Sequence, residues 1–193
     1  MHLFSSLHPQ IPALPSVNRA LDLGCGNRPI FLDTEIAKEC FAADPYPCSD
    51  SFPVTMCKGE NLPFENGAFD LVTARVAIPY MNIPVALREV RRVLSPDGRF
   101  WATLHLPRMA RKRIVSGIRR LDFVDVLFQF YALTNCALLY FSDLQLSWRG
   151  RYESVQTPRS IRNALRRSGF MDIRTEISVD PNGLRHFAVI AHR

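Results

Sequence analysis

The segment LDLGCGNRPIF, residues 21–31, constrains the fold more than any other part of the chain. It begins as a short apolar run closed by Gly24, which is typical of a strand buried on both faces of a parallel sheet. Gly24 and Gly26 predict a tight turn in which a ligand can touch the main chain. A dinucleotide site carries a further glycine beside its pyrophosphate, whereas residues 27–29 are Asn-Arg-Pro. We therefore expect the turn to favour a nucleoside ligand without phosphates.

An acidic residue follows this turn at an informative distance. Asp44 lies 20 residues beyond Gly24 and ends the predicted strand CFAAD, residues 40–44. A carboxylate at that position can accept hydrogen bonds from both hydroxyls of a ribose. The alternative is an aspartate that only precedes Pro45 in a turn. The combination with the glycine turn at this spacing favours ribose binding.

The rest of the chain alternates predicted strands with predicted helices. We expect strands over 19–24, 40–44, 69–74 and 99–106, helices over 33–40, 82–94 and 157–168, and a closing hairpin over 171–192 with its turn at 180–183. Such alternation predicts an α/β fold, a doubly wound and mostly parallel sheet with ligands at the carboxyl ends of its strands. The final hairpin predicts an antiparallel end to that sheet.

Residues 106–157 interrupt the alternation, and we expect a helical cap inserted into a single domain that spans residues 1–193. The segment 107–120 holds six cations and no acid, and the uncharged stretch 126–142 is 17 residues long. That length is at the short limit for a membrane span, and polar residues near it argue against burial in lipid. Three interpretations stay open: a cap packed on the domain, a wall for a large apolar substrate, or an interfacial helix on anionic lipid, with peripheral membrane contact through 107–148.

The net charge and the cysteines indicate which kinds of binding partner and which cellular compartment to expect. The net charge of +6 raises the odds of anionic partners such as nucleic acid, acidic lipid or phosphorylated substrates, although a solvated excess of arginine is the commoner explanation. Five cysteines form no CxxC pair, which argues against a zinc site or a disulfide framework. The proline-rich start lacks the pattern of a signal peptide. We therefore expect a cytoplasmic protein.

Four motifs occur in a characteristic order: LDLGCG, the acid Asp44, ENLPFENGAFDLV and LREVRRVLSPDGRF. In this the chain resembles the class I S-adenosylmethionine-dependent methyltransferases, and within them the small-molecule subgroup (type 11) that includes ubiquinone and menaquinone C-methyltransferases. The similarity covers about residues 19–105 and resumes over 157–193. The resemblance implies a seven-stranded sheet with a C-terminal antiparallel hairpin, and S-adenosyl-L-methionine as cofactor.

The resemblance also implies a set of cofactor-binding residues. Asp22, Gly24, Cys25 and Gly26 would line the methionine end, Asp44 would hold the ribose, and Pro45 and Tyr46 would lie near the adenine. Lys58, Gly59 and Glu60 stand where the family reads the adenine amino group, and Ala74 and Arg75 would face the methionine portion. Lys58 departs from the acid found there in the family, because a lysine can only donate hydrogen bonds.

Methyl transfer needs alignment of the acceptor and, for a hydroxyl acceptor, removal of a proton. His105, near the end of the predicted strand over 99–106, is the best-placed catalytic base, and Tyr80 and Tyr152 are further candidates for orienting an acceptor. No metal-ligand spacing is present. We expect methyl transfer to a small, apolar or ring-containing acceptor. Two alternatives stay open: an RNA methyltransferase, which the charge favours, and a non-catalytic binding partner with this fold.

Overall fold

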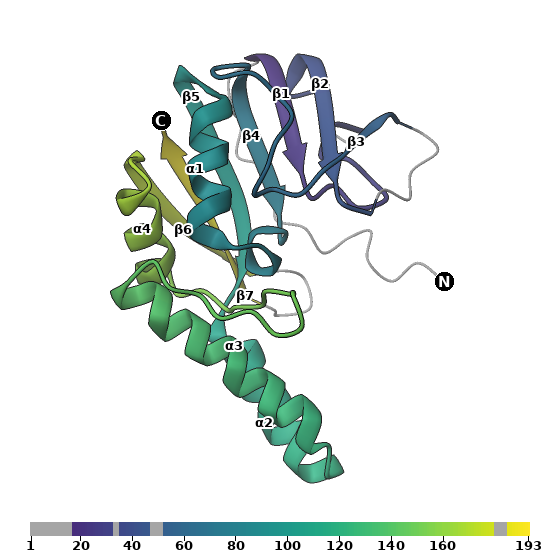
Figure 1. The fold of residues 1–193 in the computed structure, drawn as a ribbon, viewed down its shortest axis with the longest axis vertical. Coiled ribbons are helices and arrows are strands. Elements are labelled where there is room, and N and C mark those ends of the chain that lie inside the picture. The colour runs from purple at the N-terminus through teal and green to yellow at the C-terminus, as the bar shows by residue number, and fades with distance from the viewer. Residues whose placement is uncertain (1–16, 33–34, 47–51, 180–184) are drawn as a thin grey trace.

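The computed structural model describes residues 17–32, 35–46, 52–179 and 185–193. The expected turn at 180–183 and the N-terminal lead-in lie outside these residues. Within them the chain forms one sheet with helices against it and a helical hairpin that projects from one end (Figure 1).

A seven-stranded sheet organises the domain, in the order β3-β2-β1-β4-β5-β7-β6. Its strands are β1 (Val17–Leu23), β2 (Ala37–Asp44), β3 (Val54–Met56), β4 (Phe69–Arg75), β5 (Leu94–His105), β6 (Met171–Val179) and β7 (Arg185–His192). Strands β1 to β5 pair in parallel, while β7 pairs antiparallel with both β5 and β6. The predicted fold class is confirmed, including the antiparallel end.

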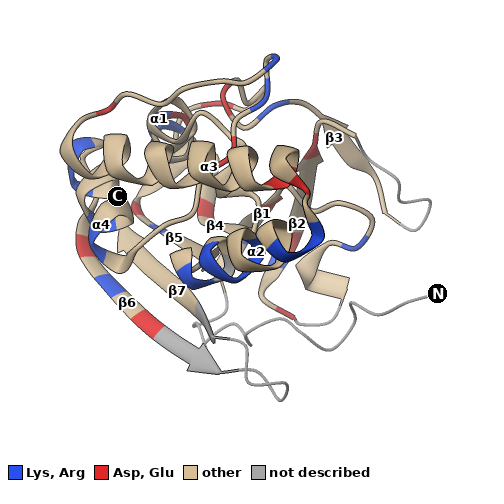
Figure 2. Ribbon diagram, turned by 90° about the horizontal axis from the view of Figure 1, so that it is seen from below, with Lys and Arg blue, Asp and Glu red and all other residues tan. Residues whose placement is uncertain are grey.

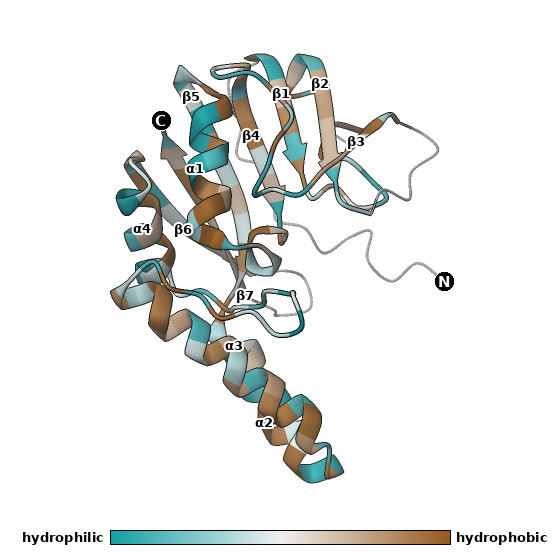
Figure 3. Cartoon of the chain, in the orientation of Figure 1, coloured by the Kyte–Doolittle hydropathy of each residue, from teal (hydrophilic) through white to brown (hydrophobic). Residues whose placement is uncertain are grey.

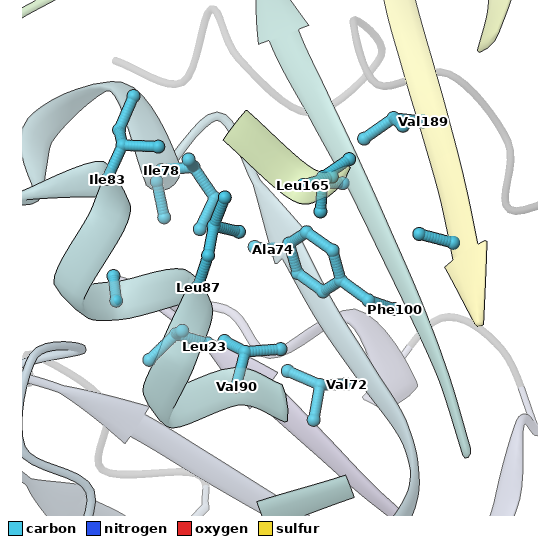
Figure 4. Packing of buried hydrophobic residues seen from close by; sticks show 14 of the residues in the cluster. Leu23, Val72, Ala74, Ile78, Ile83, Leu87, Val90, Phe100, Leu165 and Val189 are labelled. Carbon is cyan, nitrogen blue, oxygen red and sulfur yellow. The ribbon is translucent and has the colours of Figure 1, made fainter. Parts of the chain in front are cut away.

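Helices α1 (Ile83–Val93) and α4 (Pro158–Arg167) cover one face of this sheet. Leu87 and Val90 of α1 and Leu165 of α4 are fully buried with Phe100 of β5 in the main core (Figure 4). Both helices begin at capping side chains: Asn82 accepts from the amide of Val85, and Thr157 forms a capping box with Ser160. Helical spacing of apolar residues thus predicted these two helices correctly.

The opposite face carries a smaller core, in which Ala20, Leu71 and Trp101 pack against the short 3-10 helix η1 (Ile30–Leu32). The helix expected over 33–40 is wrong for residues 37–40, which belong to strand β2. Glu39 pairs with Arg19 and Cys40 with Ala20 of β1. Pairing along the neighbouring strand satisfies the main chain of this segment, and that tertiary contact outweighs a weak helical pattern.

Residues 106–157 form helices α2 (Pro107–Arg120) and α3 (Phe123–Phe141), followed by an irregular segment. The two helices pack against each other, and α3 also contacts α4. Helix α3 is long and apolar enough to cross a membrane, with a mean hydropathy of 1.4, and 28% of that window is buried inside the protein. Its Asn135 is buried and donates to the carbonyls of Leu146 and Glu153, so this polar side chain ties the irregular segment to the helix.

Candidate functional site

A cleft of about 950 Å³ lies at the carboxyl ends of β1, β2 and β4, between the sheet and the irregular segment after α3. Its sheet side is lined by Gly24, Asp44, Pro45, Tyr46, Lys58, Gly59, Glu60, Arg75, Val76 and Ala77. Its opposite side is lined by Phe128 and Tyr131 of α3 and by residues 148–153. Tyr80 and Met81 lie at the short 3-10 helix η2 (Ile78–Tyr80) that ends the sheet side.

The glycine turn after β1 has the backbone that only glycine adopts freely. Gly24 and Gly26 have φ values of 70° and 59°. A Cβ on Gly24 would lie 2.3 Å from the Cβ of Ala77, so the segment after β4 approaches the turn too closely for any side chain. A Cβ on Gly26 would meet no atom within 4 Å. The turn is therefore packed at Gly24, which lines the cleft, and open at Gly26, which does not line it.

Asp44 closes β2 and binds the glycine turn directly. Its Oδ2 accepts from the amide of Gly26 at 2.9 Å, and its Oδ1 accepts from the amide of Tyr46 at 2.8 Å. Each carboxylate oxygen offers about two acceptor positions, so each retains one for a ligand hydroxyl. The carboxylate is thus held in one orientation and keeps the acceptor capacity that a ribose diol requires.

Asp22 lies behind the turn rather than on the cleft surface. Its carboxylate is fully buried, accepts from the amide of Ile30 at 2.7 Å and from the hydroxyl of Thr73 at 2.8 Å, and lies 3.6 Å from Nη2 of Arg75. Burial raises the pKa of Asp22, and the positive charge of Arg75 opposes that rise. This differs from the expectation that Asp22 lines the methionine end. It positions η1 and Arg75 instead.

Arg75 and Ala74 also differ from the pair expected to face a ligand. Arg75 lines the cleft, but its guanidinium is bound to the carbonyl of Arg28 and to the charge of Asp22. Ala74 points into the main core, where it is fully buried (Figure 4). The end of β4 therefore contributes to the cleft its backbone and one arginine, whose guanidinium already binds other protein groups.

The loop at 58–60 forms the floor of the sheet side. All three of its residues line the cleft, as the resemblance implies. Glu60 is engaged, because its Oε1 accepts from the amide of Asn82 at 2.7 Å. A Cβ on Gly59 would lie 2.5 Å from the sulfur of Met81, so this glycine permits close packing. The loop is thus fixed to the segment that begins α1.

Cys25 does not line the cleft, and its chemistry is that of a neutral thiol. Burial, together with the negative charges of Asp22 and Asp44, raises the pKa of Cys25 to about 12. A thiol with that pKa stays protonated at neutral pH and is a poor nucleophile. Cys25 therefore fills space behind the glycine turn.

Aromatic side chains gather on the opposite side of the cleft: Phe128, Tyr131, Trp148 and Tyr152. The hydroxyl of Tyr131 lies 2.8 Å from the carbonyl of Leu146 and 3.1 Å from that of Arg151, and it donates to one of them at a time. The hydroxyl of Tyr152 accepts from the amide nitrogen of the Asn82 side chain at 3.1 Å. These bonds fix the two tyrosine rings in place. The interpretation of residues 106–157 as a wall for an apolar substrate pointed to this segment, but no motif singled out Phe128, Tyr131 or Trp148 as site residues.

Glu153 is the titratable group that sequence reasoning missed. It lines the aromatic side of the cleft, and burial raises its pKa while the charge of Arg113 opposes the rise. Burial also raises the pKa of the nearby Tyr80, and the charge of Glu153 adds to that effect. A half-buried carboxylate with a raised pKa in a cleft is a typical general base. Only the fold brings Glu153 to this wall, since the residues around it form no motif.

The structure places two of the three expected catalytic residues in the cleft. Tyr80 and Tyr152 both line the cleft, while the side chain of His105 lies outside the described part of the structure, which places only its backbone, at the end of β5. Among the described residues, no group of three or more His, Cys, Asp or Glu side chains is placed to hold a metal ion.

These features define the class of protein. A parallel sheet with an antiparallel end, a glycine turn after β1 and a carboxylate at the end of β2 make the nucleoside-binding fold of the class I methyltransferases. Residues 21–102 match the family described as a methyltransferase domain (type 11). The chain therefore has the fold of the class I S-adenosylmethionine-dependent methyltransferases and carries a methyltransferase domain match over residues 21–102. S-adenosyl-L-methionine is the cofactor of that class.

Known proteins similar to this chain are diverse. A mitochondrial arginine-hydroxylase of Danio rerio, NDUFAF5, is 36% identical over 92 residues, which cover 42% of this chain and 29% of that protein. A malonyl-[acyl-carrier protein] O-methyltransferase of Alcanivorax borkumensis is 28% identical over 108 residues, covering 49% of this chain and 37% of that protein. The matched segments thus span about a third of these relatives.

Solved structures extend the similarity over nearly the whole chain. A Thermotoga maritima methyltransferase, described as a possible histamine N-methyltransferase, shares the fold with a TM-score of 0.63 at 14% identity. The match covers 93% of this chain and 83% of that one, so it includes the sheet beyond residue 102.

Proposed function

We propose that this protein binds S-adenosylmethionine across the glycine turn and transfers its methyl group to a small, apolar or ring-containing acceptor. One observation carries the proposal: a single cleft has the Asp44-bound glycine turn on one side and four aromatic side chains on the other. Nucleoside binding and acceptor binding would thus share one cleft. When bound, the cofactor supplies a sulfonium methyl carbon, whose bond to sulfur breaks as the acceptor atom bonds to it.

The sheet side would hold the nucleoside. Asp44 keeps one acceptor position on each oxygen for a ribose hydroxyl. Tyr46, next in the cleft and 79% exposed, offers a ring against which an adenine can stack. Gly24, which lines the cleft, lets a ligand approach the main chain without meeting a side chain at that position. These residues fit a nucleoside and provide no cradle for a diphosphate.

The aromatic side would hold the acceptor. Phe128, Tyr131 and Trp148 offer apolar contact area for such a molecule. Alignment of acceptor and methyl donor is the main contribution that a protein makes to such a displacement. Two similar proteins, one named as a malonyl-[acyl-carrier protein] O-methyltransferase and one described as a possible histamine N-methyltransferase, support a small acceptor group in this fold.

Glu153 would take the proton when the acceptor atom is a hydroxyl or an N–H. Its raised pKa makes the ionised carboxylate a stronger base than an exposed glutamate. The proton moves from the acceptor atom to the carboxylate of Glu153, and it then leaves to solvent. Tyr80 and Tyr152 would orient the acceptor by hydrogen bonds. A cytosolic location is also proposed, since the four described cysteines are free.

Thermal unfolding with and without S-adenosylhomocysteine tests the cofactor half. Ligand binding to the folded state alone raises the melting temperature, and Asp44→Ala should abolish that rise. Asp97→Ala is the matched control, because Asp97 is exposed and does not line the cleft. No rise at millimolar ligand in the natural sequence would favour a non-catalytic binding partner.

Transfer of isotope-labelled methyl groups tests the acceptor half. Incubation with labelled S-adenosylmethionine and a cell extract divided into small-molecule, protein and RNA fractions should label the small-molecule fraction. Label in the RNA fraction, lost with Asp44→Ala, would establish the RNA methyltransferase alternative instead. Label in none of the fractions would contradict the proposed activity.

A further inference from the structure

The turn between α2 and α3 presents an apolar surface to solvent. We call residues 118–124 the hairpin tip, and all seven are exposed. Four of them are large and apolar: Leu121 is 74% exposed, Phe123 65%, Val124 79% and Ile118 56%. The tip lies at the end of the hairpin that points away from the sheet (Figures 1 and 3). A cluster of this kind at a protruding point marks an interaction surface.

Hydrogen bonds and close helix packing hold the hairpin tip in a defined conformation. The amide of Asp122 donates to the carbonyl of Gly117 at 2.9 Å, and the side chain of Asp122 caps α3 by accepting from the amide of Asp125 at 3.0 Å. Gly117 lets the helices pack closely, because a Cβ there would lie 2.8 Å from Val126. Leu121 occupies the left-handed C-cap, with φ of 57°, where glycine is the usual residue. The chain thus holds a large apolar side chain outward at an exposed turn.

Positive charge lies at this apolar tip and follows α2 back from it. Arg119 and Arg120 belong to the tip, and α2 carries four more exposed cations behind it: Arg108, Arg111, Lys112 and Arg113. Blue segments follow α2 in Figure 2. Two acids lie nearby, and both are engaged locally, Asp122 as the helix cap and Asp125 with the side chain of Gln129. Cations therefore outnumber acids by six to two along 108–125.

We propose that the hairpin tip docks on an anionic phospholipid bilayer, with its apolar side chains in the headgroup boundary and the cations of α2 on lipid phosphates. Apolar insertion with electrostatic attraction is the physical basis of interfacial binding. Charge complementarity selects this partner, since a symmetric contact between two copies would set arginine against arginine. An RNA backbone would match the cations but would leave the four apolar side chains in water.

The position of the hairpin tip relates docking to the cleft. Phe128 lines the cleft and follows Phe123 by five residues along α3, about 7.5 Å at the helical rise. A docked tip would therefore hold the aromatic side of the cleft close to the bilayer, where apolar molecules partition. Docking goes beyond the proposed methyl transfer and does not depend on it, because the tip contains no residue of the cleft.

Vesicle sedimentation with the full chain tests this proposal. The probes are vesicles of phosphatidylcholine alone and vesicles with a third phosphatidylglycerol. Leu121→Ser with Val124→Ser removes apolar area from the tip, and Arg119→Gln with Arg120→Gln removes charge. Phe141→Ser with Leu144→Ser is the matched control, because Phe141 ends α3 and Leu144 follows it, and these residues are 81% and 66% exposed. All six side chains are exposed, so unchanged melting temperatures are expected.

We expect binding to anionic vesicles that weakens with salt, little binding to neutral vesicles, at least tenfold weaker binding for the apolar tip pair, and unchanged binding for the control. The arginine pair should weaken binding about 25-fold, at about fivefold per cation. Absence of vesicle binding, or an equal loss in tip and control variants, would overturn the proposal. So would a dimer that the apolar tip pair converts to a monomer. The melting shift with S-adenosylhomocysteine, measured on the same variants, reports separately on the cleft.

Discussion

The amide of Gly26 donates a 2.9 Å hydrogen bond to Oδ2 of Asp44. This bond joins the turn after β1 to the end of the neighbouring strand β2, 18 residues further along the chain. Because it fixes the carboxylate before any ligand arrives, the site does not have to order that side chain on binding. The same bond makes the glycine turn and the ribose-binding acid one structural unit, and the two glycines of the turn have separable roles.

Gly24→Ala should destabilise the protein far more than Gly26→Ala. Both positions have positive φ, which costs an L residue about 1–2 kcal/mol. Only at Gly24 does the new Cβ meet Ala77, at 2.3 Å, and overpacking of that kind adds about 1–3 kcal/mol. Urea unfolding of the two variants measures the difference. Equal losses would contradict the close approach between the turn and Ala77.

Thr73→Val should destabilise the protein, while Thr103→Val should not. Both threonines are buried in adjacent strands, and the hydroxyl of Thr73 donates to Oδ1 of Asp22 at 2.8 Å. Thr103 has no hydrogen-bond partner for its hydroxyl among the described residues. Loss of the first hydroxyl leaves a buried carboxylate less satisfied and should cost about 1–3 kcal/mol. Loss of the second should be neutral or stabilising in the same denaturant titration.

Glu89→Gln should lower stability at neutral pH and remove part of the acid sensitivity. Glu89 binds Arg92 through both oxygens at 2.8 Å and accepts from the amide of Leu62, which holds the loop over 61–66 on α1. Hydrogen bonds to charged groups contribute about 1.5–3 kcal/mol.

The bond to Arg92 lowers the pKa of Glu89 below 4.5, so the folded state binds this proton more weakly than the unfolded chain. Stability from this pair is therefore present above pH 4.5 and is lost as pH falls through the lowered pKa. Glu65→Gln, at an exposed position of the same loop, is the control. A natural protein and Glu89→Gln variant with parallel acid unfolding curves would refute this role.

Glu153→Gln should act in the opposite sense with pH. Burial raises the pKa of Glu153 above 4.5, so the folded state binds the proton more tightly than the unfolded chain does. Stability then falls as pH rises from 4.5 through the raised pKa, and Glu153→Gln should remove that decline. Thermal unfolding between pH 4 and 8 measures it.

The same substitution tests the proposed base. With a hydroxyl or N–H acceptor, methyl transfer by Glu153→Gln should be slower by about 10²–10⁴-fold, with unchanged binding of S-adenosylhomocysteine. Natural activity should rise with pH through the raised pKa of the carboxyl. Full activity in the variant would assign the proton transfer elsewhere.

The order of apolar runs, turns and caps was enough to predict every strand except β3, helices α1 and α4, and the placement of Gly24 and Asp44 at the same end of the parallel strands. Each of these follows from local rules: periodicity chooses the element, glycine marks the turn, and parallel strands bring their carboxyl ends together. The same local rules were wrong for residues 37–40, where pairing with β1 decided the conformation. The local sequence pattern carries no information about such a pairing partner.

Only the tertiary structure decided which side chains face the cleft. Asp22 and Ala74 occur in or beside motifs yet are buried behind it, while Glu153 and Trp148 occur in no motif and form its wall. Their positions depend on how the segment after α3 packs across the sheet, through bonds such as that from Asn135 to the carbonyl of Glu153. The sequence by itself determined the fold and the nucleoside half of the site because those rest on neighbouring residues. The acceptor half rests on contacts between distant segments, which exist only once the chain has folded.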